Sequence, residues 1–196
     1  MHDTFINDHL ERLEQQDPGS RDHAQRVAIY GMALGQKLGL SSEDLQQLRW
    51  GLLLHDVGKL GVPDGIIRFP GKLTAKEWAA VMQHPAYGDQ MLAEVEGAGL
   101  LRTAVRHHHE RYDGDGYPAG LSRNEIPLFA RIAAICDSWD VMLTDRAYKP
   151  AMTVAEAVAE LRRCSGTQFD PSLVDLFLSV SHRMADIPSY VEHYIS

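Results

Sequence analysis

Several histidines of this sequence stand next to acidic residues, a pattern that suits metal binding and proton transfer. The chain has ten histidines, and His55 precedes Asp56 as His108-His109 precedes Glu110. Imidazole nitrogens and carboxylate oxygens both bind divalent cations, and one carboxylate can bridge two of them. Taken alone, each of these short motifs is more typical of a polar helix end, where a histidine complements the helix dipole.

Two aspartates strengthen the case for a metal site. Asp137 and Asp140 lie three residues apart in an otherwise apolar segment, and a buried carboxylate needs a cation. Asp140 could instead belong to an exposed polar stripe, and the single histidines His23 and His84 are each more typical of structural residues. Together, however, these residues favour one central site between helices. Nitrogen and oxygen ligands without cysteine favour iron, manganese or a similar ion over structural zinc.

The elements that must position these residues are helices almost throughout. Apolar residues recur at helical spacing, as Leu45, Leu48 and Leu52 do just before His55. Strand-like alternation of useful length is missing from the sequence, so we expect one all-α domain of about eight or nine helices. The expected helix boundaries are N-caps at Ser20 and Ser42, a loop over residues 58–71, capping boxes at Thr74-x-x-Glu77 and Thr153-x-x-Glu156, and a helix start at Asp170-Pro171.

Composition bounds the remaining classes of protein. Hydrophobic residues make up 44% and charged residues 23% of the chain, which is typical of a globular protein. The formal net charge of −8 argues against a protein that binds polymeric nucleic acid. Cys136 and Cys164 form no CxxC pair, which predicts reduced core thiols in a cytoplasmic protein. The apolar runs are all shorter than the roughly 18 residues of a membrane helix, so we expect no membrane insertion.

The ordered set of motifs resembles the HD-GYP phosphodiesterases, a branch of the HD superfamily of metal-dependent phosphohydrolases. The HD dipeptide alone is a weak signal, whereas the ordered set is highly specific. The matching segments are His55-Asp56-Val57-Gly58-Lys59, Pro70-Gly71-Lys72-Leu73-Thr74, His84 with Gly88, residues 108–118, Asp137 with Asp140, Arg146-Ala147-Tyr148-Lys149 and Phe169-Asp170-Pro171. The resemblance implies an HD-domain helical bundle with a five-helix core and additional C-terminal helices. It places this domain at residues 20–180, between a lead-in of residues 1–19 and a tail of residues 181–196.

The resemblance also implies the metal ligands. One ion would be held by His23, His55, Asp56 and Asp137. A second would be held by His84, His108 and His109, with Asp56 bridging, and His107 would be a flanking residue. Family members with three metals carry a glutamate four residues before the first ligand histidine. Here that residue is Gly19, so we expect two divalent ions, iron or manganese.

The implied activity is hydrolysis of the bacterial messenger cyclic di-GMP to linear pGpG, or onward to GMP. Two cations would lower the pKa of a shared water, and the hydroxide would attack phosphorus. The catalytic residues would be Asp56 and Lys59, and Lys59 would contact the scissile phosphate or assist the leaving group. Further substrate contacts are expected from Arg146, Lys149, Tyr117 and Asp140, and a role in orienting the ligand histidines from Glu110 and Asp113.

Several of these residues could also have roles that are not catalytic. Without the motif, Lys59 would be an exposed loop lysine, and Arg146 and Lys149 would be exposed cations at a helix end. The whole protein could also be a catalytically silent module that binds cyclic di-GMP and contacts a partner protein through the GYP loop, which we define as residues 113–118. A different HD chemistry, nucleotide dephosphorylation or a di-iron oxygenase, is a third hypothesis. The intact ligand set argues against the silent module, and the GYP loop with Arg146-x-x-Lys149 argues against the other chemistries.

Overall fold

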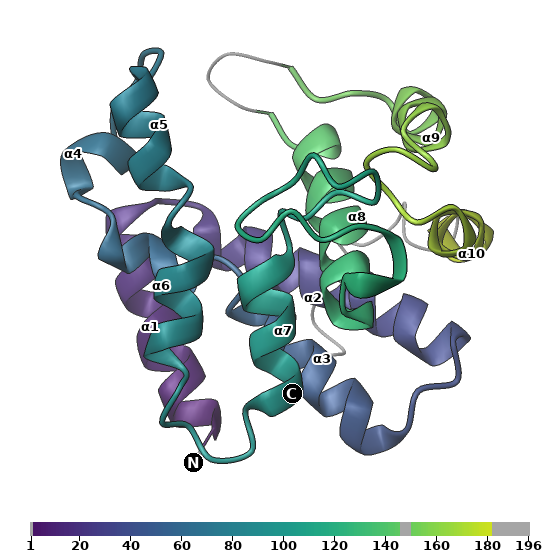
Figure 1. Ribbon diagram of the computed structural model, residues 1–196, viewed down its shortest axis with the longest axis horizontal. Helices are drawn as coiled ribbons and strands as arrows, with labels where there is room; N and C mark the ends of the chain where they lie inside the picture. Colours follow the sequence, from purple (N-terminus) through teal and green to yellow (C-terminus); the bar gives the residue numbers. More distant parts are fainter. Residues whose placement is uncertain (1, 146–149, 182–196) are drawn as a thin grey trace.

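The fold is helical throughout the part of the chain described by the computed structural model, residues 2–145 and 150–181 (Figure 1). This confirms the expected all-α fold. Arg146 and Lys149, like the tail beyond residue 181, lie outside the described residues. The elements are α1 (His2–Gln16), α2 (Ser20–Lys37), α3 (Ser42–Leu53), the 3₁₀ helix η1 (Val57–Gly61), α4 (Asp64–Ile67), α5 (Ala75–Val81), α6 (His84–Met91), α7 (Gly99–His107), the 3₁₀ helix η2 (Arg123–Glu125), α8 (Leu128–Leu143), α9 (Val154–Arg163) and α10 (Pro171–Ser181).

Residues 58–71 are more ordered than the expected loop. They contain most of η1 and the one-turn helix α4, which raises the helix count above eight or nine. Periodicity needs two turns or more to be visible in a sequence, so such short helical turns escape it.

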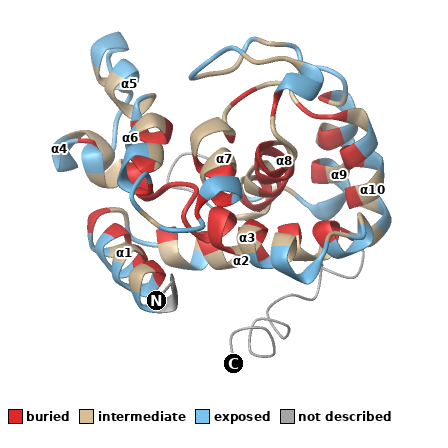
Figure 2. Ribbon diagram, turned by 60° about the horizontal axis from the view of Figure 1, so that its bottom comes forward, coloured by how far each residue is buried: buried red, intermediate tan, exposed pale blue. Residues whose placement is uncertain are grey.

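The apolar core lies between α2, α3, α7 and α8. Helix α2 packs against α3 and α8, and α7 packs against α3 and α8. Figure 2 shows buried residues concentrated on these central helices, while α4 and α5 are exposed or half-buried. Fully buried side chains such as Leu48, Leu52, Ile132 and Trp139 fill the centre. Because α3 and α7 are anchored here, the residues that follow their C-terminal ends are held in place.

Two of the expected N-caps are shifted by one residue. Helix α2 has Gly19 at its N-cap, with a φ of 90°, and Ser20 is already its first residue. Helix α3 is capped by Ser41, whose hydroxyl accepts from the Asp44 N–H. An N-cap must keep a non-helical backbone, and Ser20 and Ser42 have already entered their helices.

The other expected boundaries are confirmed. Thr74 and Thr153 each form a capping box, with Glu77 and Glu156 respectively. The Asp170 carboxylate accepts from the backbone N–H of Ser172 and Leu173 at the start of α10. These caps fix where α5, α9 and α10 begin.

Glycines allow η1 and α6 to cross at very short range. A Cβ on Gly58 would lie 1.8 Å from the carbonyl oxygen of His84 and 2.4 Å from the backbone nitrogen of Gly88. Only a residue without a side chain permits this approach. The crossing brings the chain after Asp56 against the start of α6, where His84 lies.

The two cysteines are buried and free. Within the described residues, the helices are too short or too polar to cross a membrane.

Candidate metal centre and substrate pocket

The seven expected ligands come from five places in the chain and meet at one end of the bundle. His55 and Asp56 directly follow α3, and His84 is the first residue of α6. His23 lies in the first turns of α2, Asp137 lies in α8, and His108-His109 follow α7. The structure therefore gathers every residue of the expected ligand set into one cluster.

One group of ligand atoms comprises Asp56, His84, His108 and His109. Their ligand atoms all lie within 4.8 Å of one another. Asp56 Oδ1 lies 3.2 Å from His84 Nε2 and 3.9 Å from His108 Nε2. One ion could contact all four side chains.

A second group comprises His23, His55 and Asp56, whose ligand atoms also lie within 4.8 Å of one another. Asp56 Oδ2 lies 3.5 Å from His55 Nε2, and His23 Nε2 lies 3.2 Å from Asp137 Oδ1. Asp56 thus turns one oxygen toward each group, which is the arrangement expected of a carboxylate bridging two cations.

Hydrogen bonds to the backbone show which nitrogens are free to bind. The Nδ1 atoms of His55, His84 and His108 lie 2.7–2.9 Å from carbonyl oxygens one turn earlier, those of Leu52, Val81 and Val105. A carbonyl can only accept, so each Nδ1 carries the proton and each Nε2 presents a lone pair.

These lone pairs point at one another. His84 Nε2 and His108 Nε2 lie 3.2 Å apart, and the buried His55 Nε2 has no hydrogen-bond partner among the described residues. Burial lowers the pKa of His55 and His108, and it lowers that of His109 to about 4. The neutral imidazoles of His55, His108 and His109 beside the Asp56 carboxylate fit divalent cations, because converging lone pairs of this kind are stabilised by a cation.

Both candidate carboxylate ligands are charged. Burial alone raises the pKa of the Asp56 carboxyl, but Lys59 and the neighbouring histidines outweigh it and hold this pKa well below its usual value. Burial likewise opposes ionisation of Asp137, whose pKa is nevertheless lowered by its hydrogen bond with His23. Each therefore offers an anionic oxygen to a metal.

Asp140 lies behind His23, which corrects the expectation that it contacts substrate. Its side chain is 2% exposed, and His23 Nδ1 donates to its Oδ2 over 2.7 Å. The guanidinium of Arg26 donates to both Asp140 oxygens, at 2.7 and 3.0 Å. Because its oxygens already have partners inside the fold, Asp140 orients His23 instead. Arg26, which lies one helical turn after His23, was not among the expected site residues.

Lys59 is not an exposed loop lysine, which was the alternative to a catalytic role. Its Nζ lies 2.8 Å from Asp56 Oδ2 and 3.1 Å from Asp17 Oδ2, and its side chain is 23% exposed. The ammonium thus stands beside the carboxylate shared by the two ligand groups. Asp17, from the turn between α1 and α2, was not expected here.

Glu110 and Asp113 do not contact the ligand histidines as expected. The buried Glu110 accepts from the backbone N–H of Ala119 and Leu121, at 2.8 and 3.1 Å, so it ties down the chain that leaves the GYP loop. The imidazole that Glu110 contacts is that of the flanking His107, whose Nδ1 lies 3.4 Å from Glu110 Oε1. The exposed Asp113 pairs with Arg111. Both acids therefore organise the loop, because their nearest partners are backbone N–H groups after the loop and the side chain of Arg111.

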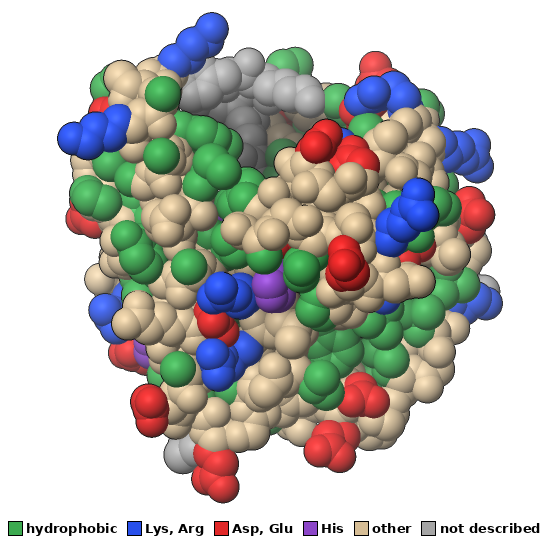
Figure 3. All heavy atoms as spheres, in the orientation of Figure 1, with side chains coloured by type: hydrophobic (Ala, Val, Ile, Leu, Met, Phe, Trp, Pro, Cys, Tyr) green, Lys and Arg blue, Asp and Glu red, His purple; other side chains and the backbone are tan. Residues whose placement is uncertain are grey.

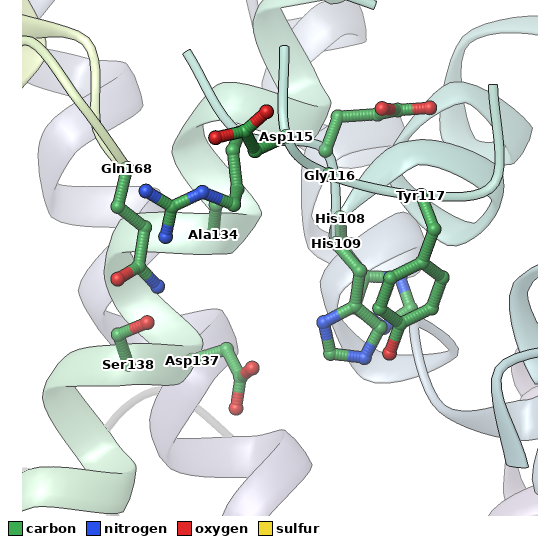
Figure 4. Close-up of a pocket in the computed structure, with 11 residues that line it drawn as sticks. His108, His109, Asp115, Gly116, Tyr117, Ala134, Asp137, Ser138 and Gln168 are labelled. Carbon is green, nitrogen blue, oxygen red and sulfur yellow. The ribbon is translucent and has the colours of Figure 1, made fainter. Parts of the chain in front are cut away.

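The GYP loop forms one wall of a pocket beside the cluster. Tyr117 stacks on His109, with ring centroids 4.8 Å apart. The pocket holds about 210 Å³, and Ser138 and Gln168 lie across it from Tyr117 (Figure 4). Its lining residues are His108, His109, Glu110, Arg111, Asp115, Gly116, Tyr117, Ala134, Asp137, Ser138 and Gln168. Ser138 and Gln168 were not expected here, since neither belongs to a motif of metal-ligand residues.

The face of the molecule drawn in Figure 3 is mixed in charge. Figure 3 shows acidic and basic side chains scattered over the visible described residues, with no continuous basic patch on this face. That polymeric nucleic acid is not a partner stays a prediction.

The sequence matches a known protein family and several characterised relatives. Residues 7–173 match the family described as HD domain. The chain belongs to the HD domain family. This chain is 39% identical over 170 residues to a cyclic di-GMP phosphodiesterase of Pseudomonas aeruginosa, covering 86% of this chain and 41% of that protein. It is 38% identical over 159 residues to a 3′3′-cGAMP-specific phosphodiesterase of Vibrio cholerae, covering 81% and 35%.

These two relatives confirm the resemblance to the HD-GYP phosphodiesterases. The present chain spans less than half of the length of each of these two proteins. A solved structure of a cyclic GMP-AMP-specific phosphodiesterase of V. cholerae superposes with a TM-score of 0.70 at 23% identity, covering 95% of this chain and 51% of that chain. The HD domain of the L. monocytogenes phosphodiesterase PgpH, solved with cyclic-di-AMP, gives a TM-score of 0.63 at 16% identity, covering 91% and 96%. Both structures share the fold.

Proposed function

We propose that this HD-domain protein hydrolyses cyclic di-GMP to linear pGpG at a pair of divalent metal ions. The observation that carries the proposal is the cage of Nε2 lone pairs on either side of Asp56, with the His84 and His108 nitrogens 3.2 Å apart. The names of the relatives support a cyclic dinucleotide as substrate. The intact ligand set gives no support to a silent binding module.

The ligand roles follow the two groups. His23, His55, Asp56 and Asp137 would hold one ion, and His84, His108 and His109 the other, with Asp56 shared. The proposed ions are iron or manganese, and a third is not proposed because Gly19 offers no ligand side chain. When bound, such ions lower the pKa of water and offset the charge on phosphoryl oxygens.

The chain's own residues bind and orient the dinucleotide. The Lys59 ammonium donates a hydrogen bond to the scissile phosphate or to the departing 3′ oxygen. Tyr117, stacked on His109, shapes the pocket wall. Arg146 and Lys149 remain proposed phosphate or guanine contacts. A protein partner at the GYP loop and a cytoplasmic location remain predictions as well.

The overall charge does not prevent an anionic substrate from binding. The protein carries a formal net charge of −8, but two divalent ions bring about four positive charges to a site with two ligand carboxylates. Lys59 adds another beside them. The local field is therefore positive although the protein is acidic.

The test is turnover by protein loaded with manganese, or with iron under anaerobic conditions. Cyclic di-GMP and 3′3′-cGAMP are supplied separately, and products are separated by chromatography. We expect linear pGpG from cyclic di-GMP, and loss of turnover in Asp56→Ala. Asp8→Ala, an exposed change on α1, is the matched control and should keep full activity.

Elemental analysis of the same samples shows whether the ions are bound. Protein that carries two ions per chain but turns over neither dinucleotide would overturn the proposal. Turnover of 3′3′-cGAMP alone would keep the chemistry and correct the substrate, an outcome made specific by the 38% identity to a 3′3′-cGAMP-specific relative.

A further inference from the structure

The Lys59 ammonium is held between two carboxylates that come from different elements. Asp56 follows α3, whereas Asp17 lies 42 residues from Lys59 in the turn between α1 and α2. The contact with Asp17 is a directed hydrogen bond of 3.1 Å, and that with Asp56 is an ion pair of 2.8 Å. Lys59 is therefore anchored from outside the metal cluster as well as from within it.

Asp17 is itself held firmly. Its backbone N–H donates to the carbonyl of Leu13 at 2.7 Å, and its own carbonyl accepts from Ser20 at 3.1 Å. The neighbouring Gln16 is buried, and its amide donates to the carbonyl of Val62, just after η1, and to the Asp64 carboxylate, both at 2.9 Å. The end of α1 is thus fastened to the segment that carries Lys59.

Electrostatics explains why a second anchor matters. Asp56 Oδ2, which the ammonium contacts, is also the oxygen turned toward His55. A divalent cation held there would repel the ammonium, and a lysine is a strongly hydrated charge on a flexible stem. The Asp17 carboxylate offsets that repulsion from the far side.

We propose that Asp17 is a positioning residue that keeps the Lys59 ammonium beside Asp56 when the metal site is filled. The tether itself stands on the contacts above, while its effect on turnover rests on the proposed function. Asp17 touches no ligand of the cluster in the contacts described, so it acts through Lys59 alone.

A double-mutant cycle tests this dependence. The metal-loaded wild-type protein, Asp17→Asn, Lys59→Met and the double variant are compared in kcat and KM for the cyclic dinucleotide that the protein turns over. We expect Asp17→Asn to lower kcat about 10-fold in the wild-type background and less than about twofold in the Lys59→Met background. An equal loss in both backgrounds would overturn the proposal, because it would mean that Asp17 supports the fold and not Lys59.

A second measurement needs no turnover. Limiting acetic anhydride labels lysine amines, and mass spectrometry reads each site in the metal-loaded protein, with the exposed Lys72 and Lys76 as internal references. We expect Asp17→Asn to raise the labelling of Lys59 several-fold relative to these lysines and Asp8→Asn to leave it unchanged. Unchanged labelling in Asp17→Asn would overturn the tether. An inactive wild-type protein would count against the proposed function alone, and the labelling would still decide the tether.

Discussion

At the scale of the residue, the centre depends on which atom of each side chain faces its neighbours. Backbone carbonyls occupy Nδ1 of three histidines and leave Nε2 free. His23 differs from these three, because its Nδ1 donates to the Asp140 carboxylate. A carboxylate behind a metal-binding imidazole fixes its ring and makes it a better ligand.

Asp140→Asn should therefore weaken metal binding without removing a ligand. The amide N–H₂ would replace either Oδ1, which accepts from Arg26, or Oδ2, which accepts from both His23 and Arg26, so at least one hydrogen bond is lost. We expect metal affinity to fall about 10–100-fold, as measured by titration of metal-free protein with manganese. Asp89→Asn, in an ion pair with Arg102 and Arg106, is the control, and equal affinities in the two variants would contradict the role of Asp140.

At the scale of the element, short-range packing and caps set the ends that carry the ligands. Gly58 lets η1 lie directly on the start of α6. Glu14, near the end of α1, accepts from the N–H groups of Gly19 and Arg21 and thereby satisfies the first turn of α2. These contacts hold the starts of α6 and α2, which carry His84 and His23.

Gly58→Ala should disrupt the crossing of η1 and α6. The new Cβ would overlap backbone atoms of α6, which cannot yield as a flexible side chain would. We expect a loss of about 3 kcal/mol or more in the free energy of unfolding, measured by urea denaturation. Gly65→Ala, where a Cβ meets nothing within 4 Å, should be close to neutral, and a similar loss in both would refute this explanation.

Glu14→Gln tests the link between α1 and α2 through pH. The backbone N–H of Gly19 and that of Arg21 lower the pKa of the Glu14 carboxyl, so its stabilising effect is complete above the unfolded pKa and is lost as the pH falls through the folded pKa. We expect the variant to be less stable by about 0.5–1 kcal/mol at pH 7. The difference should vanish once the wild-type carboxyl is protonated, and a difference independent of pH would argue against this contact.

At the scale of the whole molecule, the fold gathers four buried polar ligands at the meeting point of its core helices. Asp56, His55, His84 and His108 are all buried, and polar groups without partners are costly there. Bound cations would remove that cost. Stability should therefore be linked to metal occupancy.

Manganese should raise the melting temperature of metal-free protein. Linkage gives about 2.7 kcal/mol of added stability at a ligand concentration 100 times the dissociation constant. Differential scanning calorimetry with and without the metal measures the shift, and Asp56→Ala should lose most of it because both ligand groups share this carboxylate. An equal shift in the variant would place the bound metal elsewhere.

The helical architecture and the set of candidate ligands could be predicted from the amino-acid sequence alone. Helical periods and capping boxes such as Thr74 with Glu77 depend on residues within one or two turns, so they are legible in the chain. The ordered motifs identified the HD domain for the same reason, since each motif is a local run of residues. The division into residues 1–19, 20–180 and 181–196 stays a prediction.

Tertiary structure alone decided how the side chains serve the site. His23 meets Asp140 across 117 residues, and Lys59 meets Asp17 across 42. Packing brings such pairs together, and no local pattern encodes them. For that reason Asp140 and Glu110 took roles that the motif did not predict, and Arg26, Asp17 and Gln168 were found only in the folded protein.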